Sequence, residues 1–431
     1  MPFGKVFPNL VTAASYDPFF LYVSLDSVSS AEFAAMDFTV INEQNYETIA
    51  LIWHEFTHWI DHIGTLWGQK NLVLLLNALN ARANNDPREF WRIKTHELSN
   101  HADDLANYYN TTHMDHVGGF RNLWRYQHTC GLRFDLNGVL DEGKPLLFTK
   151  FATAQGRLIA RVPVSVVSVL ETNATYAEFM IKSGYIAGIE DIVDRMEKQR
   201  ALSRELESIL YDSDLTLYSV VAHMTATPNH ITDIFKAYDI SSSVGTLLLN
   251  LPTNVLSAAP YLPNDNEEWN RRASAMIGNA DIGFGFYNLM QNLINAYGPD
   301  NYSLANLLQA SHLPEQEELE RRVLTAMHFN LRELHPGPLS AFGTALINMG
   351  MQIFIRRGID GKKIPFTALL DQFDFTPDVI FSDTPFNNQN IDMDDVQNRM
   401  AAAEAVSFDE RIALFAFYEE KMNEFLKVCG V

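Results

Sequence analysis

Cysteine is nearly absent from this chain of 431 residues, which has only Cys130 and Cys429. Two cysteines so far apart argue against a disulfide framework and rule out a cysteine cage for a metal ion. Basic residues are also scarce, because 32 lysines and arginines face 53 aspartates and glutamates, which leaves a net charge of −21. A surface this negative repels phosphate backbones and anionic lipid. We therefore expect neither nucleic acid nor a membrane as partner.

Long apolar runs are missing as well. The most apolar stretch, LIARVPVSVVSVL at 158–170, contains Arg161 and Pro163 and is too short to span a bilayer. The first twenty residues are broken by Pro8 and lack the apolar core of a signal peptide. Neither a glycine-rich phosphate loop nor a basic patch with interleaved aromatics occurs. These absences predict a cytoplasmic protein.

What the chain does have is ample material for a core, since 47% of its residues are hydrophobic. Residues 1–41 carry short β-branched and aromatic runs that predict strands, and 132–167 predicts further strands joined by glycine turns. Apolar residues at steps of three and four predict helices at 43–63, near 165–183 and over most of the remainder. The expected fold is α+β and predominantly helical, with a small N-terminal sheet and a large helical C-terminal part.

A boundary between two domains is expected near the middle of the chain. The segment DISSSVG at 239–245 has the most linker-like composition there. This divides the chain into residues 1–240, which contain the motifs described next, and a helical domain of unknown role at 241–431.

The stretch LIWHEFTHWIDHIG at 51–64 carries the strongest functional signal. His54 and His58 are four residues apart, so on a helix they project from one face and can offer two imidazole nitrogens to one metal ion. Glu55 points about 100° away from His54, outside the inner coordination sphere but within reach of a water on the metal. Zinc makes such a water nucleophilic near neutral pH, and a neighbouring carboxylate can take its proton and return it to the leaving group.

The sequence HEFTH at 54–58 resembles the signature of the zincin metallopeptidases. The resemblance implies that His54 and His58 bind one zinc ion, that Glu55 is the general base, and that a peptide bond is hydrolysed. It also implies a zincin-like catalytic core in which a substrate-binding edge strand precedes the helix, for which AMDFTVI at 35–41 is the local candidate.

A catalytic zinc ion needs a third protein ligand. The metzincin branch would place it ten residues after His54, behind a glycine at seven; those positions hold Gly64 and Asp61, which excludes that branch. The gluzincin branch uses a glutamate on a later helix. LETNATYAEF at 170–179 offers two candidates, of which we favour Glu171 over Glu178. Thr175 stands where many gluzincins have an acid, so support for the ligands must come from another residue.

Other polar residues receive lesser roles. Asp61 and His62, one turn after the motif, are candidates for orienting the ligands or lying on the surface, and Tyr176 and His223 for stabilising an oxyanion, with Tyr218 and His128 also available. The segment HELSNH at 96–101 spaces its histidines by five, which predicts a polar helix and no metal site. The segment NTTHMDHVGG at 110–119 is expected to be a solvated loop.

Together these observations predict a zinc metallopeptidase of gluzincin type that acts on a protein or peptide. Two alternatives remain: a metal-dependent hydrolase of a non-peptide bond, which would use the same activated water, and a catalytically inactive zincin-like binding protein.

Overall fold

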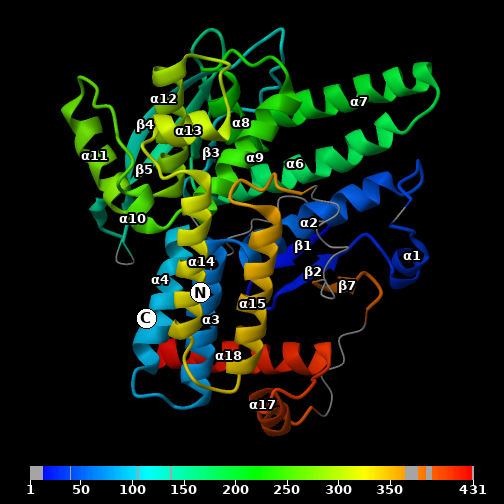
Figure 1. Ribbon diagram of the computed structural model, residues 1–431, viewed down its shortest axis with the longest axis vertical. Coiled ribbons are helices and arrows are strands. Elements are labelled where there is room, and N and C mark those ends of the chain that lie inside the picture. The colour runs from blue at the N-terminus through cyan, green and yellow to red at the C-terminus, as the bar shows by residue number, and fades with distance from the viewer. Residues whose placement is uncertain are drawn as a thin grey trace.

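The computed structural model describes residues 13–38, 40–103, 106–135, 138–364, 377–384 and 391–429. Figure 1 shows a mostly helical α+β protein with two small sheets. The strands are β1 (Ser15–Asp17), β2 (Tyr22–Leu25), β3 (Thr111–Thr112), β4 (Arg125–Phe134), β5 (Leu140–Ala152), β6 (Leu158–Pro163) and β7 (Asp378–Phe381). The first helices are α1 (Ser30–Ala35), α2 (Tyr46–Gly64), α3 (Leu66–Ala83), α4 (Glu89–Asp103), α5 (Ala106–Tyr109), α6 (Val166–Ala187), α7 (Ile192–Leu210) and α8 (Thr216–Ala226).

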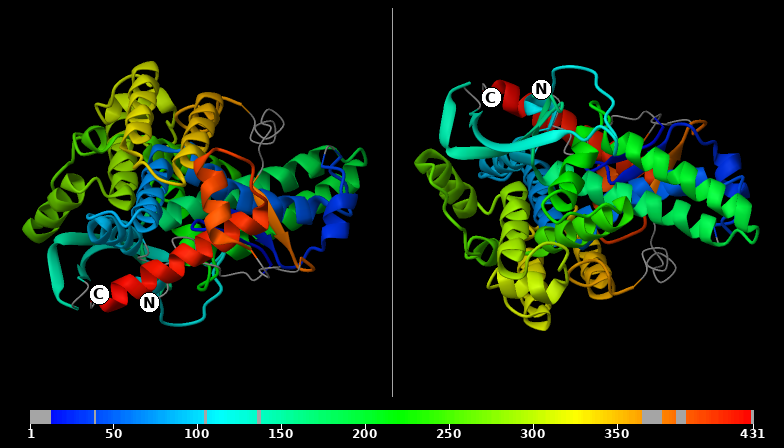
Figure 2. Two further views of the ribbon diagram at one scale, coloured as in Figure 1. Left: turned by 90° about the horizontal axis from the view of Figure 1, so that it is seen from below. Right: turned by 90° about the horizontal axis from the view of Figure 1, so that it is seen from above.

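The remaining helices confirm the helical character of the second half. They are α9 (Ile234–Asn250), α10 (Thr253–Leu256), α11 (Glu267–Gly278), α12 (Ile282–Tyr297), α13 (Leu304–Ala310), α14 (Gln316–Glu333), α15 (Ser340–Arg357), α17 (Met393–Ala401) and α18 (Phe408–Val428). Helices α6 and α7 reach away from the rest of the molecule, whereas α18 crosses one end of it (Figure 2). No helix in these described ranges is both long and apolar enough to cross a bilayer.

The N-terminal sheet differs from the expected one. Strands β1 and β2 are antiparallel, but the third strand is β7, which pairs parallel to β2 with Tyr22 opposite Asp378. The predicted strand at 35–41 is wrong: Ala35 ends α1, and residues 36–38, 40 and 41 form no strand. The capping box of Ser29 and Glu32 starts a helix just before this segment, so its apolar residues do not extend as a sheet edge.

The second sheet confirms the strands expected from the glycine turns. Its order is β3-β6-β5-β4, all antiparallel. Gly138 and Gly156 lie between its strands with φ of 77° and 84°, a conformation that glycine adopts without strain. Strand β6 runs directly into α6, and Val164 and Ser165 are the only residues between them.

Helix α2 lies in the middle of the molecule, packed against α3, α6 and α15. Thr65 alone separates α2 from α3, and its hydroxyl caps α3 by accepting from Gly68 N. Helix α15 approaches α2 very closely, since a Cβ on Gly64 would lie 2.4 Å from Ile353 Cγ2. This contact fixes the C-terminal end of α15 beside the second half of α2.

The domain boundary expected at 239–245 is not a linker. These residues lie inside α9, and most of them are buried, because Ala237, Ile240, Val244 and Leu247 continue an apolar helical pattern through the serines. Helix α9 packs on α6, and one hydrophobic core joins residues from both halves of the chain, such as Val167 and Leu346. The serine-rich composition therefore marks the small residues of a buried helix.

Candidate metal centre

The two histidines of the motif and one glutamate meet between α2 and α6. His54, His58 and Glu171 each offer one ligand atom, and these atoms all lie within 4.8 Å of one another. Glu171 Oε2 is 3.5 Å from His54 Nε2 and 3.6 Å from His58 Nε2. His58 and Glu171 are buried, and the side chain of His54 is 12% exposed. This group can hold a metal ion, and no other such group occurs in the described part of the chain.

The distances fit metal ligation better than direct hydrogen bonding. Three ligand atoms placed about 2.0–2.1 Å from one tetrahedral ion would lie about 3.4 Å from each other. Separations of 3.5 and 3.6 Å are close to that value and too long for good hydrogen bonds. Glu171 Oε2 is buried and has no hydrogen-bond partner among the described residues. A buried carboxylate oxygen in this state is strongly disfavoured unless a cation completes its surroundings.

The electrostatics point the same way. Burial opposes ionisation of Glu171, but His58 and His54 hold the pKa of this carboxyl down at about 2. Neither a lysine nor an arginine of the described ranges pairs with Glu171. The site thus offers an ionised carboxylate and two imidazoles without any built-in permanent cation, which is a donor set that zinc accepts.

The second candidate ligand, Glu178, lies against the other ring nitrogen of His54. Its Oε2 lies 3.4 Å from His54 Nδ1, on the far side of the ring from Glu171. Lys182, one turn further along α6, lies 2.8 Å from Glu178 Oε1 and also pairs with Glu47 and Glu205. Glu178 is therefore held in place to orient the His54 ring. This is the support that Thr175 does not provide.

Glu55 and Tyr218 complete the surroundings of the cluster. Glu55 is 7% exposed, and burial raises the pKa of its carboxyl, against the opposing effects of His54 and His58. A raised pKa suits a group that must both accept and return a proton near neutral pH. The Tyr218 ring, on α8, lies 6.2 Å from the His54 ring. Burial and the charges of Glu171 and Glu55 keep the pKa of Tyr218 far above its usual value, so the phenol retains its proton.

The other candidates for an oxyanion stabiliser lie in other surroundings. Tyr176 donates to Asp239 Oδ1 at 2.6 Å, and His223 Nε2 lies 2.8 Å from Leu210 O. His128 lies on β4, with its Nδ1 3.1 Å from Thr149 Oγ1. Of the four residues considered from sequence, Tyr218 is the one whose ring contacts a ligand of the cluster.

Asp61 and His62 turn away from the cluster. Asp61 is fully buried and pairs with Arg357 at the end of α15, and its Oδ2 accepts from Asn173 Nδ2 at 2.8 Å. This Asp61 junction (Asp61, Asn173 and Arg357) ties α2 to α6 and α15. His62 Nδ1 lies 2.8 Å from the hydroxyl of Tyr16, and burial lowers the pKa of His62 to about 4.

Of the remaining histidine segments, HELSNH lies in a helix as expected, whereas the loop expected at 110–119 is wrong at Thr111–Thr112, which form β3. Helix α4 contains His96, whose Nε2 lies 3.1 Å from Asn100 Nδ2. Residues 113–118 form a loop, in which His116 Nε2 lies 3.4 Å from Asn122 Nδ2.

Sequence reasoning missed two residues of this region. Lys182 carried a usable signal, because it lies four residues after Glu178 on one helix face. Arg357 carried none, since it is 296 residues from its partner Asp61 and nothing in the local sequence connects them. Comparisons with protein-family models, with curated proteins and with solved structures gave no match to this chain.

Proposed function

We propose that this protein is a zinc-dependent metallopeptidase with a gluzincin-like site in a zincin-like core formed around α2 and α6. The observation that carries the proposal is the arrangement of His54, His58 and Glu171, whose buried donor atoms have metal-ligand spacing and include a carboxylate oxygen without a hydrogen bond. The HEFTH motif adds Glu55 in the position of a general base. Zinc suits two imidazoles and one carboxylate.

When bound, zinc would polarise the substrate carbonyl and make a water molecule nucleophilic near neutral pH. Residues of the protein would then transfer the protons and stabilise the developing charge. Glu55 takes the proton of the attacking water and passes it to the leaving amine, and its raised pKa allows both steps. The protonated Tyr218 donates a hydrogen bond to the carbonyl oxygen as negative charge develops there. Glu178 orients His54.

Access to the site follows from the exposures of its residues. His54 at 12% and Glu178 at 22% are the accessible members, whereas His58 and Glu171 are closed off. A substrate would therefore approach from the His54–Glu178 side. The excess of acidic residues, with a net charge of −21, favours substrates without strong negative charge.

The proposal is tested on the full-length protein, stripped of metal and titrated with zinc. We expect one zinc ion per chain and hydrolysis in a screen of peptides. Glu55→Gln should reduce turnover by about 10²–10⁴-fold and leave zinc stoichiometry unchanged. Glu197→Gln, an exposed glutamate on α7, is the control and should keep both.

Other results would support one of the two alternative functions or overturn the metal site. Turnover of acyl esters but of no peptide would identify a metal hydrolase of a non-peptide bond. Zinc binding without any turnover would leave an inactive zincin-like binding protein. Failure to bind zinc after repletion would overturn the metal centre itself.

A further inference from the structure

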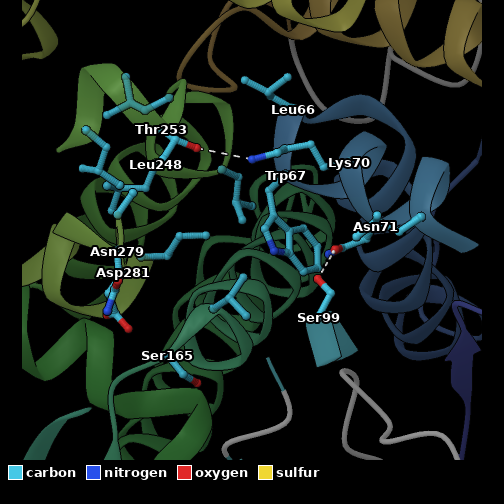
Figure 3. Close-up of a pocket in the computed structure, with 18 of the residues that line it drawn as sticks. Leu66, Trp67, Lys70, Asn71, Ser99, Ser165, Leu248, Thr253, Asn279 and Asp281 are labelled. Carbon is cyan, nitrogen blue, oxygen red and sulfur yellow. Dashed lines mark hydrogen bonds between the residues drawn. The ribbon is translucent and has the colours of Figure 1, made fainter. Parts of the chain in front are cut away.

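A second site lies beside the first residues of α3 and α6. A cavity of about 390 Å³ opens between α3, α9, α10 and the N-terminal ends of α6 and α12 (Figure 3). Its wall includes Leu66, the first residue of α3, and Val166, the first residue of α6. Neither the metal ligands nor Glu55 lines it. The cavity is therefore separate from the metal centre.

The walls of this cavity are mixed, with polar side chains such as Asn71 and Ser99 beside an aliphatic part. Five buried leucines contribute to them, namely Leu66, Leu248, Leu249, Leu251 and Leu256. Protein interiors are normally close-packed, with few voids larger than a water molecule, because unfilled apolar space forfeits dispersion contacts. A volume of about 390 Å³ falls within the roughly 300–1,000 Å³ of small-molecule sites. The aliphatic part of the walls fits a hydrocarbon chain better than it fits water.

The charged residues that line the cavity include one lysine that has no acidic partner in the described part of the chain. Three charged residues face the cavity: Lys70, Arg133 and Asp281. Arg133 and Asp281 offset one another, since Arg133 acts to lower the pKa of Asp281, although burial raises that pKa overall. Asp281 is also satisfied as the cap of α12, where it accepts from Phe284 N at 2.8 Å. Lys70 has no acidic partner within the described ranges, although acidic residues outnumber basic ones in this chain.

Lys70 is held at the edge of the cavity. Its Nζ donates to Thr253 Oγ1 on α10 at 3.3 Å, a bond that Figure 3 shows between opposite walls. Both residues are exposed, whereas the leucines behind them are buried. The cavity thus combines a single positive charge without an acidic partner at its edge with a buried group of leucines in a wall that also has polar side chains.

We propose that this cavity binds a single-chain aliphatic carboxylate, with its hydrocarbon tail among the leucines and its carboxylate on Lys70. One negative charge on the ligand matches the one unpaired cation, and the aliphatic tail fills space that the protein leaves unpacked. A bound chain would contact the start of α3, which follows α2 directly, and the start of α6. The cavity therefore offers this ligand a means of stabilising both helices that hold the metal ligands.

Binding of sodium decanoate, below its micellar concentration, tests the proposal by calorimetry on the full-length protein. We expect one site per chain and a rise in melting temperature with ligand concentration. Quenching of tryptophan fluorescence should accompany binding and weaken in Trp67→Phe, because Trp67 lines the cavity. No measurable binding of decanoate would overturn the proposal.

Two variants test separately the contact of the ligand's carboxylate with Lys70 and the entry of its hydrocarbon tail into the cavity. Lys70→Met keeps the aliphatic stem and removes the charge, so decanoate should bind about tenfold more weakly while decanol binding is unchanged. Thr253→Trp, at an exposed position, should block entry of both ligands. Lys427→Met is the control, as an exposed lysine away from the cavity. Unchanged decanoate affinity in both Lys70→Met and a folded Thr253→Trp would contradict the site.

The nature of the ligand is tested separately. Decylamine should bind more weakly than decanoate, because Lys70 repels it. Tighter binding of decylamine, or binding to phosphatidylcholine–phosphatidylglycerol vesicles that decanoate does not compete with, would overturn the assignment. Every readout is a binding measurement, so the result is independent of whether the metal centre hydrolyses peptides.

Discussion

Two buried carboxylates of the α2–α6 pair are stabilised in different ways. Asp61 is paired with Arg357 and accepts a hydrogen bond from Asn173, so its charge is compensated within the protein. Glu171 is equally buried and ionised, yet it faces two imidazoles at 3.5 and 3.6 Å and the phenol of Tyr218, and one of its oxygens has no hydrogen bond among the described residues. The first arrangement is complete as a structural junction, whereas the second has no lysine or arginine partner and leaves donor atoms that could hold an external cation.

The difference shows how a candidate metal site can be told from a structural ion pair by its contacts and charges. Burial alone does not separate Asp61 from Glu171, since both are at most 1% exposed. What separates the two carboxylates is a permanently charged partner: Arg357 pairs with Asp61, whereas neither a lysine nor an arginine of the described ranges pairs with Glu171. The following experiments test this distinction, beginning with the largest expected effect.

Arg357→Met should destabilise the fold by about 3–5 kcal/mol, because it leaves Asp61 charged and buried without a partner. The loss should be the same with and without zinc in urea unfolding. Arg332→Met, an exposed arginine on α14, is the control. Adding Asp61→Asn to Arg357→Met should recover part of the loss, and a purely additive double variant would show that the two residues are not coupled.

For Glu171→Ala, in contrast, the effect should depend on zinc. Zinc affinity should fall by more than the roughly 10–100-fold typical of residues that only orient a ligand, because a ligand itself is lost. The variant should be destabilised more with zinc than without it, because zinc binding stabilises only the parent strongly, whereas the metal-free protein loses only the interaction of Glu171 with His58 and His54. Competition with a zinc chelator and urea unfolding measure the two quantities. Glu197→Ala on α7 should change neither, and an unaltered zinc affinity in Glu171→Ala would place the third ligand elsewhere.

Glu178→Gln sharpens the role of the outer carboxylate. Zinc affinity should fall by about 10–100-fold, because the amide orients His54 less firmly than the carboxylate does. Glu205→Gln is a matched control, since Glu205 contacts Lys182 but not His54. Equal losses in both variants would assign the effect to Lys182 and not to His54.

His96 illustrates a third way to bury a titratable group, which is to leave it uncharged. Burial lowers the pKa of His96 from 6.5 to about 4, so on acidification the unfolded chain takes up a proton that the folded protein refuses. Its contribution to stability is complete above pH 6.5 and declines as the pH falls toward 4. The loss at pH 5.5 is on the order of 1.4 kcal/mol.

The variant His96→Gln should reduce the dependence of the unfolding free energy on pH between 8 and 5.5. Denaturant titrations at several pH values measure it, with the exposed His328→Gln as control. A slope as steep as that of the parent protein would show that other groups, such as His62, dominate the acid response.

Local patterns were enough to predict much of the site. The spacing of His54 and His58 and the apolar stripe of α2 are properties of one helix, and Glu171 was favoured from the helix that follows an apolar segment. The glycine turns between β4, β5 and β6 are equally local. What escaped prediction depends on contacts between distant segments. Arg357 finds Asp61, and β7 completes the N-terminal sheet, only through the tertiary fold.

Two wrong predictions have the same origin. Residues 35–41 have the composition of a strand, but the capping box before them starts a helix that ends at Ala35, and the described residues 36–38, 40 and 41 belong to no strand. Residues 239–245 have the composition of a linker, but α6 provides a surface on which small side chains pack well. Composition limits which secondary structures a segment can form, and packing against neighbouring segments determines which of them it adopts.

The parallel pairing of β2 with β7 has a consequence for synthesis of the chain. The partner of residues 22–25, at 378–381, leaves the ribosome only after more than 350 further residues. Throughout that interval β2 lacks its parallel neighbour, and an open strand edge of this kind invites association with other nascent chains. We expect truncations before residue 378 to aggregate for this reason, even though α2 and α6, which carry the candidate metal ligands, are already present in them.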